Sequence, residues 1–200
     1  MLDPNCRGAT GYGVAHPEAV KADGCGGREP ADIPAGIGAL VAGGLAERSK
    51  IAVAGNSCGG FSNWLAIIRH ADPVTGAIPM RRMSRLDIDD HATELPQGRA
   101  GSAAMMGGRP KRFPGKYAIA GPENFIDRIR GALMIVRRLA DSNIGPQNTD
   151  LAVRERTAAG IAPEVGFYAE KGHGVFRRGN VADCLARSER FPARAVGETR

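Results

Sequence analysis

Residues 51–60 are the segment that most narrows the folds open to this chain. They read Ile-Ala-Val-Ala-Gly-Asn-Ser-Cys-Gly-Gly, a short apolar run that turns abruptly through a serine. An apolar segment of helical length follows at once in residues 61–70. The order predicts a buried strand, a tight glycine turn and a buried helix, which is a building block of parallel sheets.

The glycine–serine turn also has a chemical interpretation, in which Ser57 is a nucleophile. The pattern Gly55-x-Ser57-x-Gly59 between a strand and a helix holds a serine in a strained backbone conformation, with its Oγ raised above the sheet. A side chain at either glycine would collide with neighbouring chain. The following helix would point its first amides at negative charge forming beside that oxygen. Because the chain contains 28 glycines, a purely structural turn is the alternative.

Length and composition favour one globular domain, spanning residues 1–200. A hydrophobic fraction of 42% is ordinary for such a domain. No apolar run approaches the roughly 18 residues of a membrane span, and no secretory signal is visible at the N-terminus. We therefore expect a cytoplasmic protein with no membrane partner. The four cysteines are scattered without a C-x-x-C pair, which favours free thiols over disulfides or a metal site.

The net charge of +6 raises the question of a nucleic-acid partner. Part of that charge comes from arginine pairs at residues 81–82, 137–138 and 177–178. No nucleic-acid-binding motif and no interleaved aromatic residues accompany these pairs. We therefore expect a solvated basic face and no nucleic-acid partner.

Strand and helix patterns alternate along the rest of the chain. We expect further strands at residues 76–80, 132–136 and 165–168, and helices at 32–46, 151–159 and 181–191. Asp32 is the expected cap of the first of these helices, and Pro192 the expected end of the last. Residues 1–30 read as loop, and residues 81–122 as a lid-like excursion with one short helix. The alternation predicts an α/β fold with a mostly parallel sheet and helices on both faces.

Two residues could complete a catalytic triad with Ser57. Asp141 follows the strand predicted at 132–136, and His173 follows the strand predicted at 165–168. A serine hydroxyl is a poor nucleophile, so a histidine has to take its proton and a carboxylate has to orient the imidazole. Individually, His173 reads as a surface-loop residue and Asp141 as a turn former. The conjunction of serine, acid and histidine in that order, each at a strand end, favours the catalytic interpretation.

Four segments together resemble a known family, the prolyl oligopeptidase family of serine peptidases with its dipeptidyl and acylaminoacyl peptidase branches. Residues 4–13 resemble its Asn-x-Arg-Gly-Ser-x-Gly-Tyr-Gly loop, and residues 51–60 its serine turn. Residues 127–143 resemble its acid segment, and residues 172–180 its histidine loop. Only residues 85–115 align poorly. The resemblance implies the α/β-hydrolase fold.

The same resemblance implies roles for particular residues. Ser57, Asp141 and His173 become the catalytic triad. Tyr12 matches a tyrosine whose hydroxyl donates to the oxyanion, and the backbone amide of Cys58 would be the second donor. Each such donor is worth roughly 3–4 kcal/mol of transition-state stabilisation. Without the resemblance, Tyr12 reads as an ordinary aromatic residue in a glycine loop. Serine acyl transfer needs no metal and no organic cofactor.

The chain also departs from the family pattern. The family's N-terminal β-propeller and the first strands of its hydrolase sheet have no counterpart here. By the family's strand order, one missing strand lies between a strand ending near residue 5 and the strand before Ser57. The expected domain is therefore partial, with a gap in its sheet or an exposed edge. In addition, Cys58 stands where an aromatic residue is usual, and Arg137-Arg138 replaces a His-Gly or Gln-Gly pair.

From these residues we expect a serine hydrolase that cleaves peptide bonds of short peptides through an acyl-enzyme on Ser57. One alternative is a carboxylesterase for small esters, because the same machinery cleaves esters more easily and a site without a propeller would admit them. Another is a catalytically inactive hydrolase fragment that depends on a partner for its missing strands. The expected partners are a short peptide or small ester, and either a second copy of the chain or the missing propeller region.

Overall fold

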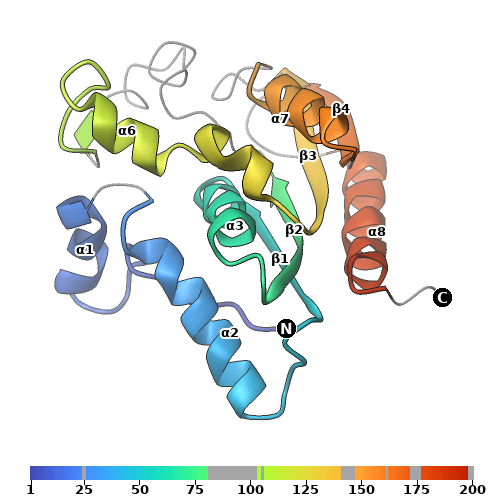
Figure 1. Cartoon of the computed structure of the whole chain (residues 1–200), viewed down its shortest axis with the longest axis horizontal. Coiled ribbons are helices and arrows are strands. Elements are labelled where there is room, and N and C mark those ends of the chain that lie inside the picture. Colours follow the sequence, from blue (N-terminus) through green and yellow to red (C-terminus); the bar gives the residue numbers. More distant parts are fainter. Residues whose placement is uncertain are drawn as a thin grey trace.

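The structure is a computed structural model, shown in Figure 1. It describes residues 1–23, 26–80, 103–104, 106–140, 147–160, 162–171 and 177–197. Within these ranges strands and helices alternate along most of the chain, as the sequence predicts.

The core of the fold is a parallel sheet of four strands in the order β1-β2-β3-β4. Each of the four strands was predicted from its apolar run, and each extends beyond the prediction at one end or both. Because all four run in the same direction, their carboxyl ends meet at one edge of the sheet. The bounds of the strands are β1 Ile51–Asn56, β2 Val74–Met80, β3 Ala132–Ala140 and β4 Glu164–Lys171.

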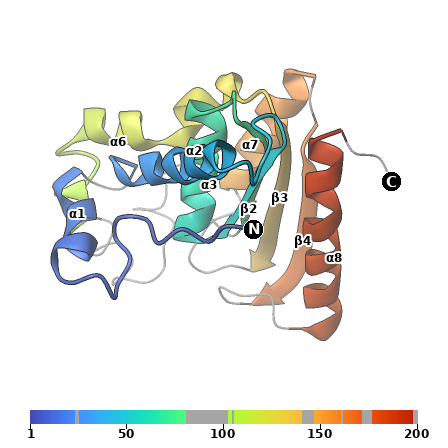
Figure 2. The same cartoon turned by 90° about the horizontal axis from the view of Figure 1, so that it is seen from below.

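Helices cover both faces of this sheet, which confirms the predicted layering. In Figure 2, α2, α3 and α7 lie on one side of the strands and α8 lies on the other. The described helices are α1 Ala15–Asp23, α2 Asp32–Ala42, α3 Cys58–Arg69, α6 Pro114–Ala120, α7 Gln147–Ala158 and α8 Arg178–Ala195, with 3-10 helices η1 Glu29–Ala31 and η2 Pro122–Arg128.

The two faces of the sheet form separate hydrophobic clusters. Side chains along a strand alternate between faces, and β3 shows this clearly. Leu133 and Ile135 join the cluster that includes α3, while Met134 and Val136 join the cluster that includes α8. Because both faces are buried, the strands are apolar at consecutive positions, as is typical of parallel sheets.

Strand β1 lies at one end of the described sheet and pairs there with β2. Near its carboxyl end, Ala54 and Asn56 are exposed. The strand that the resemblance placed near residue 5 is not observed, because residues 1–6 have no regular secondary structure. These residues, Met-Leu-Asp-Pro-Asn-Cys, lack the apolar run that a strand needs.

The first thirty residues differ from the prediction of a continuous loop. Helix α1 lies within them, and the 3-10 helix η1 begins at Glu29. The residues of α1, Ala-His-Pro-Glu-Ala-Val-Lys-Ala-Asp, contain no glycine and have proline in the first turn, where it is tolerated. The helix was not predicted because the many glycines on either side of it favoured a loop.

Two helix ends were predicted from single residues, the start of α2 from Asp32 and the end of α8 from Pro192, and both predictions were wrong. Asp32 is not the cap of α2 but its first residue, after the N-cap Ala31, and its carboxylate binds Arg7 instead. Pro192 does not end α8, which continues to Ala195. A proline so near the C-terminus of a helix removes only one late hydrogen bond, and the buried Phe191 beside it keeps this turn packed on the sheet.

The predicted helix at 32–46 is shorter than expected, because α2 ends at Ala42. The chain turns there through Gly44, whose φ is +67°. The amide of Leu45 then donates to the carbonyl of Leu40 at 2.9 Å, which closes the helix end. None of the helices in the described ranges is long and apolar enough to cross a membrane.

Candidate active site

Ser57 directly follows β1 and has an unusual backbone conformation. Its φ is +52° and its ψ is −115°. Among the described residues, it is the only non-glycine residue with a positive φ. Such a conformation costs on the order of 1–3 kcal/mol and persists only where the surroundings impose it. The strained turn predicted from the glycine–serine pattern is therefore confirmed.

Two residues before Ser57, the backbone at Gly55 is closely packed against the start of α3. A Cβ added at Gly55 would lie 2.7 Å from both the carbonyl carbon and the carbonyl oxygen of Gly59. Only glycine fits there, as predicted. The same expectation for Gly59 was wrong, because a Cβ added at Gly59 meets nothing within 4 Å. Gly59 lies on the exposed side of the helix start, so it is not required by sterics.

Hydrogen bonds fix the turn on both sides of Ser57. Its amide donates to the carbonyl of Met80, at the end of the neighbouring strand β2, at 3.0 Å. Its carbonyl accepts from the amide of Phe61, also at 3.0 Å, which starts α3. Ser57 is thus joined to β2 as well as to β1 and α3.

Asn63 is a buried support of this turn that the sequence analysis missed. Its Nδ2 donates to the carbonyl of Ile78 at 3.3 Å, and a Cβ on Gly55 would lie 3.0 Å from that nitrogen. The side chain therefore connects α3 to β2 beneath the serine. A polar residue in the apolar run of residues 61–68 was the signal that could have identified it.

The Ser57 side chain is half-buried and stands at the N-cap of α3, yet it makes no cap hydrogen bond. A serine at this position ordinarily accepts a hydrogen bond from an amide of the first turn. The amide of Cys58 belongs to the first N–H groups of α3, which have no acceptor within a helix. The turn thus places a hydroxyl beside free backbone donors, the arrangement that stabilises an oxyanion.

The other two predicted triad residues, Asp141 and His173, lie outside the described residues. The strands that lead to them are described. Strand β3 ends at Ala140 and β4 ends at Lys171, and these two residues are partners in the parallel register. Both strands therefore end at the carboxyl edge of the sheet, which is also the edge where Ser57 follows β1.

Tyr12 lies on a surface loop between two glycines in the left-handed region, Gly11 and Gly13. Its side chain is 58% exposed. The ring contacts the imidazole of His16, with centroids 5.1 Å apart and planes inclined by 51°. Within the described residues, no hydrogen bond or ring contact joins Tyr12 to Ser57.

A polar network close to Tyr12 was not predicted. Arg7 binds the carboxylate of Asp32, and the imidazole of His16 binds the carbonyls of Asn5 and Cys6. Arg7 and Asp32 are 25 positions apart in sequence. No local pattern links them, so sequence reasoning assigned Asp32 to a cap and gave His16 no role.

A cavity of about 380 Å³ lies away from Ser57, beside the C-terminal end of α3. Its wall includes Ile37 and Val41 of α2 and His70 after α3. Burial, and then the charge of Arg69, lower the pKa of His70. Since a helix of 12 residues is about 18 Å long, this cavity is separate from the surroundings of the serine.

The sequence model of the prolyl oligopeptidase family matches residues 1–199 of the chain. Among curated protein sequences, none matches.

Solved structures of several peptidases have a similar fold. A Mycobacterium tuberculosis puromycin-hydrolyzing peptidase is 23% identical over 98% of this chain, with a TM-score of 0.87. The dipeptidyl peptidase 4 of Porphyromonas gingivalis is 20% identical over 94% of the chain, with a TM-score of 0.79. An acylaminoacyl peptidase of Pyrococcus horikoshii is 18% identical over 94%, with a TM-score of 0.78. These similarities confirm the predicted α/β-hydrolase fold.

The chain corresponds to only part of each of these structures. It spans 30% of the length of the puromycin-hydrolyzing peptidase, 25% of the dipeptidyl peptidase and 30% of the acylaminoacyl peptidase.

Proposed function

Because the chain belongs to the prolyl oligopeptidase family of serine peptidases, we propose that it cleaves peptide bonds of short peptides through an acyl-enzyme on Ser57. The observation that carries this proposal is the conformation of Ser57. The residue has a positive φ, follows the carboxyl end of a parallel strand and makes no cap hydrogen bond. A structural serine at the start of a helix would not need this strain.

In the proposed reaction, Ser57 Oγ attacks the carbonyl carbon of the substrate. His173 accepts the proton of the hydroxyl and returns it to the departing amine, while Asp141 orients the imidazole. Water then attacks the acyl-enzyme and regenerates the serine. Tyr12 and the amide of Cys58 are the proposed donors to the oxyanion.

The sheet supports this assignment and also sets a requirement on it. Ser57, Asp141 and His173 each follow the carboxyl end of a strand in one parallel sheet. Strands β1 and β4 are three inter-strand spacings apart, about 14 Å at about 4.8 Å each. The segment that carries His173 therefore has to extend across β3 and β2 to reach the serine.

The similar structures support short peptides as the substrate class. Their names include a dipeptidyl peptidase and an acylaminoacyl peptidase. Both names describe enzymes that act on peptides.

A fluorophosphonate probe tests the nucleophile directly. We expect the purified chain to be labelled at Ser57, and the Ser57→Ala variant to lose the label. Ser62→Ala is a matched control, because the Ser62 hydroxyl lies on the same helix and donates to the Cys58 carbonyl at 3.1 Å. It should be labelled like the unaltered chain. A chain that unfolds cooperatively and yet is not labelled at Ser57 would refute the catalytic role and favour an inactive hydrolase.

Substrate class is tested by comparing p-nitrophenyl esters with aminoacyl and dipeptidyl anilides. Turnover of both, lost together in Ser57→Ala, supports a peptidase. Turnover of esters without any turnover of anilides would replace the peptidase assignment with a carboxylesterase.

A further inference from the structure

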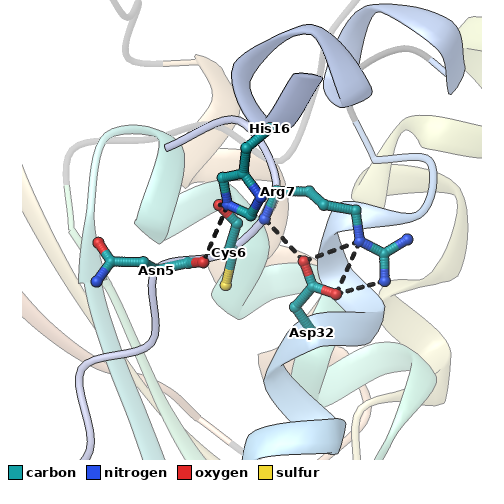
Figure 3. A network of polar contacts seen from close by, with 5 residues as sticks. All are labelled: Asn5, Cys6, Arg7, His16 and Asp32. Atoms are coloured by element: carbon teal, nitrogen blue, oxygen red, sulfur yellow. Dashed lines mark hydrogen bonds and ion pairs between the residues drawn. The ribbon is translucent and has the colours of Figure 1, made fainter. Parts of the chain in front are cut away.

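The loop that carries Tyr12 is fixed to the rest of the molecule by a set of polar contacts, which we call the N-terminal anchor. It consists of Asn5, Cys6, Arg7, His16 and Asp32, shown in Figure 3. These residues come from the N-terminal loop, from the start of α1 and from the start of α2. The anchor therefore connects three segments that are separate in the sequence.

The strongest contact in the anchor joins Arg7 to Asp32. The Arg7 Nε donates to both carboxylate oxygens, at 2.9 and 3.1 Å, and the Arg7 amide donates to Oδ2 at 2.8 Å. The Arg7 Nη2 also contacts Oδ1. Burial alone would raise the pKa of Asp32, but the hydrogen bonds from Arg7 outweigh it and lower that pKa. One carboxylate thus holds both the backbone and the side chain of Arg7.

His16 extends the anchor to Tyr12 itself. Its Nε2 lies 3.0 Å from the Cys6 carbonyl and 3.3 Å from the Asn5 carbonyl, so that nitrogen carries the hydrogen and donates. The amide of Gly8 donates in return to the His16 carbonyl at 3.0 Å. The other contact of the imidazole is the ring of Tyr12. His16 is therefore the residue that touches both the anchored backbone and the tyrosine.

The loop needs such contacts because its glycine-rich backbone can adopt many conformations. Gly8, Gly11 and Gly13 all have a φ between +77° and +101°. Glycine enters this region freely and leaves it as freely, so it does not fix a conformation. A tyrosine between two such residues would sample many positions unless side chains held the loop.

We propose that His16 and the Arg7–Asp32 pair are positioning residues that hold Tyr12 in place as an oxyanion donor. This inference rests on the proposed function, in which Tyr12 donates to the developing negative charge. A donor is effective only when it is already placed where the charge forms. Loosening the anchor lowers the fraction of molecules in which Tyr12 is placed correctly, and it leaves substrate binding and Ser57 unchanged.

The test is a double-mutant cycle on ester hydrolysis, with p-nitrophenyl acetate as the substrate. We expect Arg7→Gln and His16→Ala each to lower kcat about tenfold, with KM changed by less than about twofold. Neither should lower kcat further in a Tyr12→Phe background, because there the donor is already absent. Equal losses in both backgrounds would overturn the positioning role. The control is Arg48→Gln, which breaks an exposed arginine–aspartate pair at Asp72 and should change neither background.

Amide hydrogen exchange tests the anchor without any need for activity. We expect Arg7→Gln to accelerate exchange at least about tenfold at the amides of Gly8 and Ala9, which donate to the carbonyls of His16 and Cys6, with β2 and β3 unchanged. Unaltered exchange in these residues would overturn the anchor whatever the kinetics. If Tyr12→Phe alone leaves kcat unchanged, the donor role of Tyr12 fails and the positioning role fails with it. If Ser57 is unreactive in the fluorophosphonate experiment, the proposed function fails on its own separate readout.

Discussion

Ser57 and Tyr12 are both proposed to act on the same substrate carbonyl, yet the molecule holds them in different ways. Ser57 is fixed by backbone packed against backbone, with Gly55 pressed on Gly59 and a buried helix behind. Tyr12 lies on a surface loop that is fixed by side chains distant in sequence. The first arrangement is rigid by sterics and local in sequence. The second depends on charge and hydrogen bonds, so pH and single polar substitutions can loosen it.

The largest effect should come from adding one methyl group beneath the serine. We expect Gly55→Ala to lower the free energy of unfolding by about 3 kcal/mol, because the new Cβ would collide with rigid backbone. The matched substitution Gly59→Ala meets open space, so it should be neutral or stabilising by up to about 1 kcal/mol. Urea unfolding of the two variants measures both. Equal losses would mean that packing at Gly55 does not hold the turn.

A smaller effect should come from relieving the strain at Ser57 itself. We expect Ser57→Gly to be more stable than Ser57→Ala by about 1 kcal/mol, since glycine adopts a positive φ without the steric cost that alanine retains. Thermal unfolding compares the two variants, both of which lack the hydroxyl. A Gly variant no more stable than the Ala variant would show that the turn stores no strain.

The anchor should contribute less, and its contribution should depend on pH. We expect Asp32→Asn to cost about 1 kcal/mol or less at pH 7, because the Arg7 and Asp32 side chains are 34% and 21% exposed and solvent screens them. Since folding lowers the pKa of Asp32 below 3.8, the stabilisation is complete above that pH. It is lost as the pH falls through the lower, folded-state pKa.

Unfolding of the Asp32→Asn variant and the unaltered chain, compared from pH 7 down to pH 3, measures this difference. The exposed pair partner Asp72, changed to Asn, serves as the control and should cost nothing measurable. A cost for Asp32→Asn that persists unchanged at the acid end would contradict the assigned role of the carboxylate.

The smallest effect concerns two thiols, one in each region, and it changes a reaction rate while leaving the fold intact. Cys58 is exposed beside Ser57, whereas Cys6 is partly buried in the anchor. Burial, and then the charge of Asp32, raise the pKa of the Cys6 thiol and reduce its thiolate. We expect iodoacetamide at pH 7.5 to modify Cys58 faster than Cys6. Peptide mass mapping over time compares them, with Cys58→Ala as the control. Faster modification of Cys6 would mean that the anchor is open.

The sheet could be predicted well from the sequence, because parallel strands that are buried on both faces consist of short runs of apolar residues. All four strands and the helices beside them follow from such runs, as at residues 132–136. Predictions that relied on one residue did less well. Pro192 lies inside α8 because neighbouring contacts such as those of Phe191 hold the turn. Asp32 binds a distant arginine in preference to its own helix, and no local rule anticipates that choice.

The candidate site shows the same difference between features that are local in sequence and features that depend on distant residues. The strained conformation of Ser57 could be predicted because the glycine–serine pattern that indicates it is local in sequence, although the requirement for glycine holds at Gly55 and not at Gly59. The support from Asn63 and the anchor around His16 could not be predicted, since each depends on a carbonyl brought close by folding. The roles of Asp141 and His173 stay predictions.

The amide of Ser57 donates to the carbonyl of Met80, so the serine is part of the β1–β2 ladder although it lies outside β1. Strand β2 ends at Met80, so a displacement of that end of the strand acts on the serine through a single hydrogen bond. Twisting or spreading the two strands at this edge has to break that bond before the serine can shift. A scalar coupling measured by NMR between the Ser57 nitrogen and the Met80 carbonyl carbon would therefore report any distortion at the carboxyl edge of the sheet.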